Sequence, residues 1–187
     1  MAVYGRSPRG YTPRHLAERI LTSKSALEGE RKNVTVLFVD IVESSQLAEQ
    51  LDPETMHEIM DHVLRLMAQM VHRYEGTVNQ FLGDGLMALF GAPLALEDHA
   101  VRAAHAALGI RETVEGYSEQ LKRERGVALR LRIGMNTGPV IVGKIGDDLR
   151  MDYTAIGDTT HLASRMKSLA EPGSIVVTEA PHRLIAG

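Results

Sequence analysis

The feature that most constrains this chain is residues 34–40 (VTVLFVD), an apolar and β-branched run that ends on an acidic residue. Runs of this composition form strands that are buried in a sheet. This run presents Asp40 at its carboxyl end. We therefore predict a sheet protein with a carboxylate at the end of a buried strand.

Helical periodicity follows this strand. Apolar residues recur at helical spacing over 47–71, and an Asp-Pro pair at 52–53 divides the pattern into a short helix and a longer one. A long helix is predicted from about residue 97 to 125, and a further helix over 157–169.

A hairpin is predicted after the first long helix. Residues 77–82 and 86–90 have strand composition, and they flank Gly-Asp-Gly at 83–85. Glycine beside aspartate is typical of a tight hairpin turn. The turn would present Asp84 on a rigid tip.

A second pair of strands is predicted over 128–135 and 140–142, around the Asn-Thr-Gly-Pro sequence at 136–139. Residues 174–177 have the composition of another strand. The order of elements is then βαββαβ with additions, which indicates an α+β fold.

The length of 187 residues suits one domain with an extension. We expect a flexible lead-in and a linker helix over 13–26 within residues 1–30, and a single domain over 31–187. With no cysteine, the chain has neither disulfides nor thiolate metal sites. A net charge of -3 argues against nucleic acid as a partner, and no run approaches the ~18 apolar residues of a membrane span.

Asp40 and Asp84 are the candidates for metal binding. Two carboxylates that converge with a backbone carbonyl suit hard cations such as magnesium or manganese. Taken singly, each aspartate is also explained as a turn or cap residue.

Phosphate binding has candidates on two predicted helices. Ser44 and Ser45 stand where a helix begins, so they suit either a triphosphate or a helix cap. Arg165 suits either charge neutralisation on phosphate or a solvated helix face. Other histidines fall on predicted helices and are expected on solvated faces: His57, His62, His72, His99 and His105.

Four segments together resemble the class III adenylate and guanylate cyclases, from about residue 31 to the end. They are 37–41 (LFVDI), 81–90 (FLGDGLMALF), 132–138 (RIGMNTG) and 153–166 (YTAIGDTTHLASRM). The resemblance implies a ferredoxin-like βαββαβ core in a two-layer sandwich. It also implies a head-to-tail homodimer with active sites at the subunit interface.

The resemblance further implies roles for individual residues. Asp40 and Asp84 would hold two divalent metal ions, Mg²⁺ or Mn²⁺, with the carbonyl of Ile41 assisting. The partner subunit would supply a base-selecting pair, Gln80 and Thr154, and a transition-state pair, His161 and Arg165.

Three features depart from the commonest family pattern. Gln80 replaces a purine-contacting lysine, and its amide can pair with either purine. A threonine at the position of Thr154 is found in one bacterial branch of adenylate cyclases, which favours ATP over GTP. His161 replaces an asparagine, which leaves open a weak or inactive regulatory domain.

A further hairpin with a phosphate-binding lysine would follow residue 187 in the family, so we expect a domain truncated there. The leading hypothesis is conversion of ATP to 3′,5′-cyclic AMP and pyrophosphate in the cytoplasm, with flanking regulatory domains. The alternatives are a nucleotide-sensing, dimerising module and a guanylate cyclase.

Overall fold

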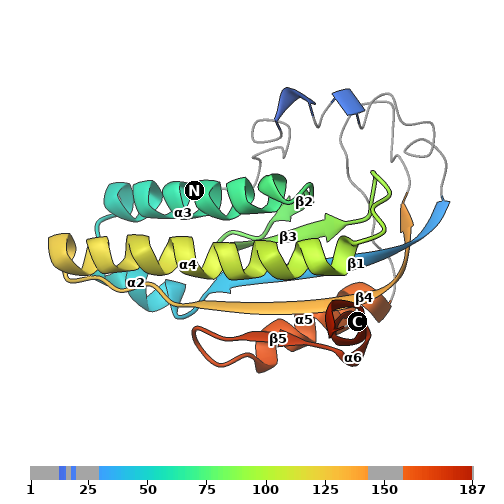
Figure 1. Ribbon diagram of the computed structural model, residues 1–187. Coiled ribbons are helices and arrows are strands. Elements are labelled where there is room, and N and C mark those ends of the chain that lie inside the picture. Colours follow the sequence, from blue (N-terminus) through green and yellow to red (C-terminus); the bar gives the residue numbers. More distant parts are fainter. Residues whose placement is uncertain (1–12, 16–17, 20–29, 143–157, 187) are drawn as a thin grey trace.

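The computed structural model describes residues 13–15, 18–19, 30–142 and 158–186 (Figure 1). In chain order the elements are β1 Glu30–Ile41, α2 Ser44–Gln50, α3 Pro53–Arg73, β2 Thr77–Phe81, β3 Gly85–Phe90, α4 His99–Arg125, β4 Leu131–Val142, α5 Asp158–Leu169, β5 Ile175–Val177 and α6 Glu179–Ala186.

Among the described residues the sheet has five strands in the order β2-β3-β1-β4-β5, with β1 at its centre. Neighbouring strands run antiparallel except β4 and β5, which are parallel. The elements β1, α3, β2, β3, α4 and β4 form a ferredoxin-like βαββαβ unit. The α+β prediction is therefore confirmed.

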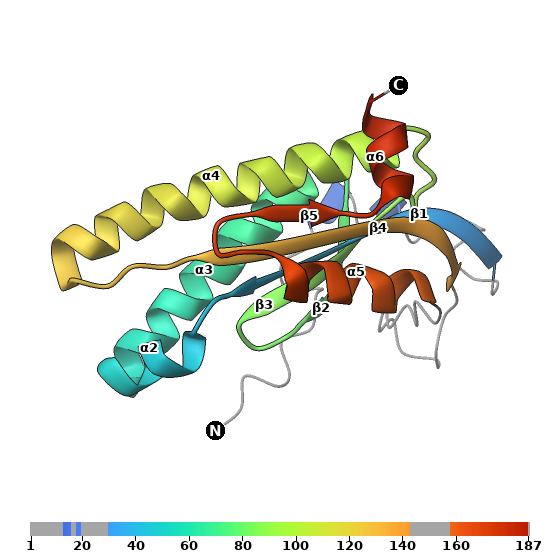
Figure 2. The ribbon, with the colours of Figure 1, turned by 90° about the horizontal axis from the view of Figure 1, so that it is seen from below.

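Different helices pack on the two faces of the sheet. Residues Leu37, Val39 and Ile41 of β1 belong to the larger apolar core, which α3 and α4 complete. The alternate residues of β1, such as Val36 and Phe38, belong to a second cluster that includes Ala163 of α5. Figure 2 shows α4 and α5 on opposite sides of β4 and β5. Because side chains alternate along a strand, the even-numbered residue Asp40 lies on the α5 face.

The break between the first two helices is where the sequence predicts it. The side chain of Asp52 accepts a hydrogen bond of 2.9 Å from the backbone N–H of Thr55, and Pro53 is the first residue of α3. Proline suits the first position of a helix because a backbone N–H there would have no helical acceptor.

The predicted pair of strands over 128–135 and 140–142 is wrong, because β4 is one continuous strand. It pairs with β1 residue by residue, from Glu30 opposite Val142 to Ile41 opposite Leu131. In contrast, β5 pairs only with residues 133–135. Beyond these residues, and within the described part of the chain, β4 pairs with β1 alone, a setting that tolerates Pro139 without a turn.

The linker helix predicted over 13–26 lies mostly outside the described residues. Residues 14–15 and 18–19 are helical, and Arg19 forms a 2.8 Å ion pair with Glu75. Among the described helices, none has the length and apolar character to cross a bilayer.

Candidate metal and nucleotide site

The register of β1 and β3 brings the two predicted metal aspartates together. Asp40 lies directly opposite Gly85, the residue after Asp84. The backbone N–H of Ile41 donates a hydrogen bond of 3.0 Å to the carbonyl oxygen of Asp84. The end of the central strand and the turn of the β2–β3 hairpin are thus held to each other by their backbones.

Glycine at position 85 permits this approach. A Cβ built on Gly85 would lie 1.9 Å from the carbonyl oxygen of Val39. That distance is far inside van der Waals contact, so a side chain here would separate the two strands beside Asp40.

Ser44 acts on Asp84. Its Oγ donates a hydrogen bond of 2.6 Å to Oδ2 of the aspartate. The helix cap is Glu43, in a left-handed conformation with φ 58° and with no capping bond from its side chain. Ser44 therefore orients a carboxylate rather than capping α2, and the neighbouring Ser45 is exposed.

Asp40 is buried, with 6% of its surface exposed, and two basic residues neutralise it. Arg132, its direct partner on β4, donates from Nε to Oδ1 at 3.2 Å and from Nη2 to Oδ2 at 3.1 Å. The Nζ atom of Lys167 lies 2.7 Å from Oδ2. One carboxylate thus has two cationic partners.

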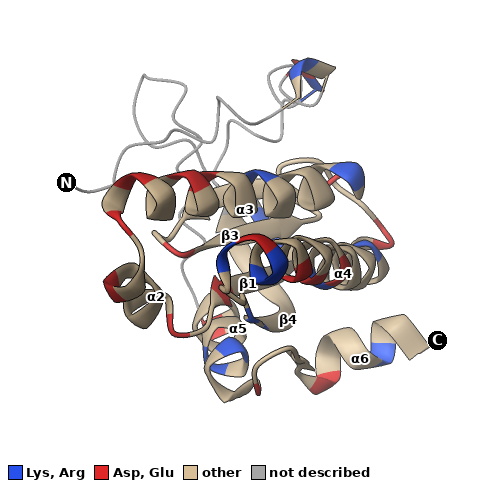
Figure 3. Cartoon of the chain, turned by 90° about the vertical axis from the view of Figure 1, so that its left-hand side faces the viewer, with Lys and Arg blue, Asp and Glu red and all other residues tan. Residues whose placement is uncertain are grey.

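Lys167 reaches Asp40 because α5 lies against the sheet at Gly134. A Cβ on this glycine would lie 2.0 Å from the backbone nitrogen of Lys167 and 2.6 Å from the carbonyl oxygen of Ala163. Ala163 itself is fully buried. The last turn of α5 is therefore fixed close to β4, and Figure 3 shows the basic residues of this helix in blue.

The start of α5 is held by a buried amide. Nδ2 of Asn136 donates a hydrogen bond of 3.0 Å to the carbonyl oxygen of Thr159. Its Oδ1 accepts one of 2.6 Å from the hydroxyl of Thr178. Asn136 therefore ties the first turn of α5 to β4 and to the residue before α6.

Within the described residues, no hydrogen bond or ion pair joins the other predicted site residues to the two aspartates. His161 and Arg165 are exposed and four residues apart on α5, so they share one helix face. Gln80 is exposed on β2, beside an irregularity in its pairing with β3. Thr154 lies outside the described residues.

The donor set fits a hard divalent cation. Asp40, Asp84 and the carbonyl of Ile41 supply only oxygen ligands, which magnesium and manganese prefer. The ammonium group of Lys167 lies against Asp40, so one cation is already bound at this carboxylate. Within the described residues no group of three or more His, Cys, Asp or Glu side chains could hold a metal. Remaining ligands would then be phosphate oxygens and water, as is usual for magnesium.

Sequence reasoning missed Arg132, Lys167 and Asn136. Arg132 had a detectable signal, because it stands on a predicted strand within a family-like segment. Lys167 and Asn136 had none, since their partners come from elements far away in the sequence.

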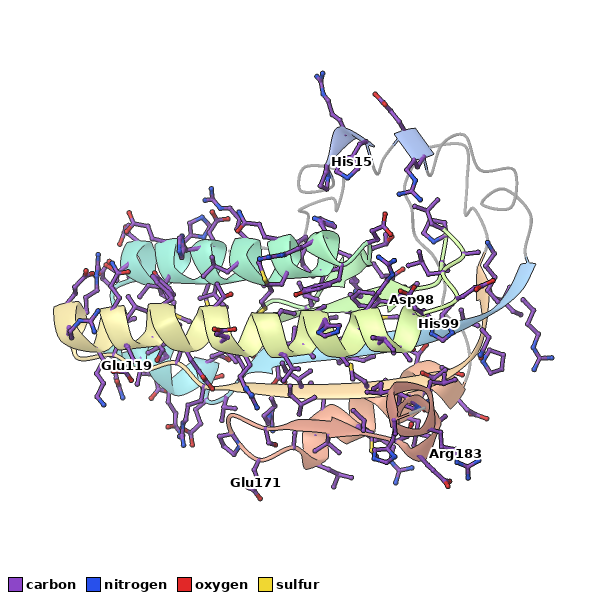
Figure 4. All side chains as sticks on the ribbon, viewed as in Figure 1. His15, Asp98, His99, Glu119, Glu171 and Arg183 are labelled. Carbon is purple, nitrogen blue, oxygen red and sulfur yellow. The ribbon has the colours of Figure 1, made fainter. Side chains whose placement is uncertain are left out.

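The prediction of solvated histidines is wrong for two of them. His99, at the start of α4 (Figure 4), is buried and bonds through Nδ1 to the hydroxyl of Thr35 at 2.8 Å. Burial lowers the pKa of His99, against the opposing effect of Asp98. Burial also lowers the pKa of His72 to about 4, with repulsion from His15 as a smaller cause.

Known proteins are similar to this chain in sequence and in fold. The family model of the adenylate and guanylate cyclase catalytic domain matches residues 28–186. Adenylate cyclase 1 of Rhizobium meliloti is 31% identical over 161 residues, covering 85% of this chain and 24% of that protein. The soluble guanylate cyclase subunit beta-2 of Rattus norvegicus is 28% identical, covering 92% and 25%. The chain thus spans about a quarter of the length of these curated relatives.

Solved structures agree with these sequence matches. The adenylyl cyclase CyaB from P. aeruginosa has a TM-score of 0.80 at 35% identity, covering 86% of this chain and 83% of that one. The guanylyl cyclase Cya2 has a TM-score of 0.78 at 29% identity, covering 85% and 81%. The chain belongs to the adenylate and guanylate cyclase catalytic domain family.

Proposed function

We propose that this domain converts ATP to 3′,5′-cyclic AMP and pyrophosphate. The ribose 3′ hydroxyl attacks the α-phosphorus and passes its proton to a substrate phosphate oxygen or to water, while the bond to the pyrophosphate group breaks. The observation that carries the proposal is the hydrogen bond between Ile41 and Asp84, which holds two candidate metal carboxylates at adjacent strand ends.

Asp40, Asp84 and the carbonyl of Ile41 would hold two divalent ions, Mg²⁺ or Mn²⁺. When bound, such ions supply Lewis-acid activation of the attacking hydroxyl and neutralise charge on the leaving phosphates. Ser44 keeps the Asp84 carboxylate in one orientation through its 2.6 Å hydrogen bond. The exposed Ser45 and the backbone at the start of α2 bind the triphosphate.

A homodimer would complete the site. Arg165 and His161 of the partner subunit stabilise charge on the phosphoryl group and position the ribose. In the described residues of one subunit, neither side chain makes a hydrogen bond or ion pair, and both are exposed. Exposed groups on one helix face are available to a second subunit, which supports a composite site.

Gln80 and Thr154 select the purine base. The glutamine amide both donates and accepts, so it can pair with the adenine edge, and the threonine hydroxyl adds a second contact. Adenylate cyclases at 31% and 35% identity and guanylate cyclases at 28% to 30% are both among the relatives, so the proposal of ATP rests on the residues at positions 80 and 154.

A second candidate function is a nucleotide-sensing module that turns over little substrate. Two observations favour it: the histidine at position 161, and the two cations that already neutralise Asp40. Guanylate cyclase activity is the alternative within the same enzyme class.

The wider setting is also a proposal. Residues 1–30 would form a linker to a regulatory region, and residues 31–187 the cyclase domain of a cytoplasmic signalling protein. The relatives support this, because each is about four times as long as the matched segment.

The test is cyclic nucleotide production with Mn²⁺ and either ATP or GTP, at high protein concentration. Asp84→Ala should lose activity by about a hundredfold or more, since a metal carboxylate is removed. Asp98→Ala is the matched control, because Asp98 is an exposed aspartate at the start of α4 (Figure 4). Equal loss in both variants, or cyclic GMP as the main product, would overturn the proposal of an adenylate cyclase.

A further inference from the structure

We propose that Lys167 is an internal cation which holds Asp40 in the metal-free enzyme and must leave when a divalent ion binds. This inference rests on the metal site of the proposed function and adds a competitor to it. Metal binding would then be coupled to the side chain of a residue on α5, the helix that carries His161 and Arg165.

The first step is the geometry of the pair. Nζ of Lys167 lies 2.7 Å from Oδ2 of Asp40, a distance typical of a strong charge-assisted hydrogen bond. The side chains of Lys167 and Asp40 are 17% and 9% exposed, so solvent screens the pair less than it would a surface ion pair.

The second step is that a metal ion and the lysine compete for the same oxygen. A protonated lysine has three donors and no lone pair, so it cannot become a ligand. A divalent ion on Oδ2 would also repel an ammonium group at this distance. The two cations therefore exclude each other.

The third step identifies which basic residue leaves. Arg132 is the cross-strand partner of Asp40 and contacts both carboxylate oxygens, so its planar group is held by strand register. Lys167 contacts one oxygen through a flexible stem. The lysine is the partner that can withdraw while the carboxylate stays oriented.

Mn²⁺ binding to the full chain, followed by electron paramagnetic resonance, tests the competition. Lys167→Gln should bind Mn²⁺ at least roughly fivefold more tightly than wild type, since the competing charge is gone. Lys167→Met should behave in the same way. Lys122→Gln removes the same charge from an exposed position on α4 and should leave the affinity unchanged.

A second measurement follows the lysine directly. Amine acylation read by mass spectrometry should modify Lys167 slowly without metal, and faster once Mn²⁺ is bound. Lys122 serves as the internal reference. Unchanged reactivity of Lys167 at saturating Mn²⁺ would show that the ammonium stays in place and would overturn the inference.

The aspartate variants separate the two proposals. If Asp40→Asn and Asp84→Asn bind Mn²⁺ as wild type does, the metal site of the proposed function is wrong. If both lose Mn²⁺ while Lys167→Gln and Lys167→Met bind no more tightly than wild type, only the competition by Lys167 is wrong.

Discussion

The backbone N–H of Ile41 donates a hydrogen bond to the carbonyl oxygen of Asp84 over 3.0 Å. This bond joins two segments that are more than forty positions apart in the sequence. It places the hairpin turn that carries Asp84 beside the end of the central strand, which carries Asp40. The site therefore depends on close contact between β1 and β3.

Gly85→Ala tests that dependence. The new Cβ would lie 1.9 Å from the carbonyl oxygen of Val39, so β3 must shift away from β1. We expect a loss of roughly 2–4 kcal/mol in the free energy of unfolding, measured by urea denaturation, together with loss of cyclase activity. Gly116→Ala is the control, because nothing lies within 4 Å of its built Cβ on an exposed face of α4. It should stabilise the protein by about 0.5–1 kcal/mol. Equal stability of the two variants would contradict the packing argument.

Mixing two inactive variants tests the composite site. Asp84→Ala damages one half of each site and Arg165→Ala the other half. If the subunits pair at random, half of the dimers are mixed and each has one intact site, so roughly a quarter of wild-type activity should return. Cyclic nucleotide assays of the mixture and of each variant alone measure this. No recovery from two folded, dimeric variants would rule out a shared site.

The lowered pKa of His72 should make the folded protein less stable in mild acid. Burial lowers the pKa of His72 from 6.5 to about 4. Below pH 6.5 the imidazole of His72 is therefore protonated in the unfolded chain, whereas in the folded chain it stays neutral until about pH 4. The stabilisation is complete above pH 6.5 and is lost as the pH falls toward 4, by roughly 1–3 kcal/mol in the free energy of unfolding.

Urea denaturation at pH 7 and pH 5 measures this effect. His72→Phe should lose less stability between the two pH values than wild type, because no imidazole is left to protonate. His182→Phe changes an exposed histidine on α6 and should keep the wild-type dependence. Identical pH profiles for the His72 variant and wild type would assign the acid sensitivity to other groups.

Asn136 positions α5. Asn136→Leu removes the hydrogen bonds to Thr159 and Thr178, which leaves a buried carbonyl and a half-buried hydroxyl without these partners. We expect a loss of roughly 1–3 kcal/mol in the free energy of unfolding and a lower kcat, because α5 carries Arg165. Thr178→Val removes only one of the two bonds and should have the smaller effect in both urea denaturation and turnover. A larger effect of Thr178→Val would argue against this role for Asn136.

Local patterns in the sequence determined much of the fold. The apolar run over 34–40 predicts the central strand, and the Gly-Asp-Gly turn predicts the hairpin that carries Asp84. Asp52 and Pro53 mark the start of α3 because capping and proline geometry act within one helical turn. These features depend on neighbours along the chain, so a sequence contains them directly.

The tertiary structure alone decided the surroundings of the site. Strand pairing with β1 makes β4 continuous through Pro139, although local sequence there suggests a turn. Close packing at Gly134 brings Lys167 to Asp40, a partner 127 positions away in the sequence. Periodicity and turn chemistry describe interactions between near neighbours. The charge balance at Asp40 instead comes from side chains on three different elements, which meet only when β1, β4 and α5 pack together.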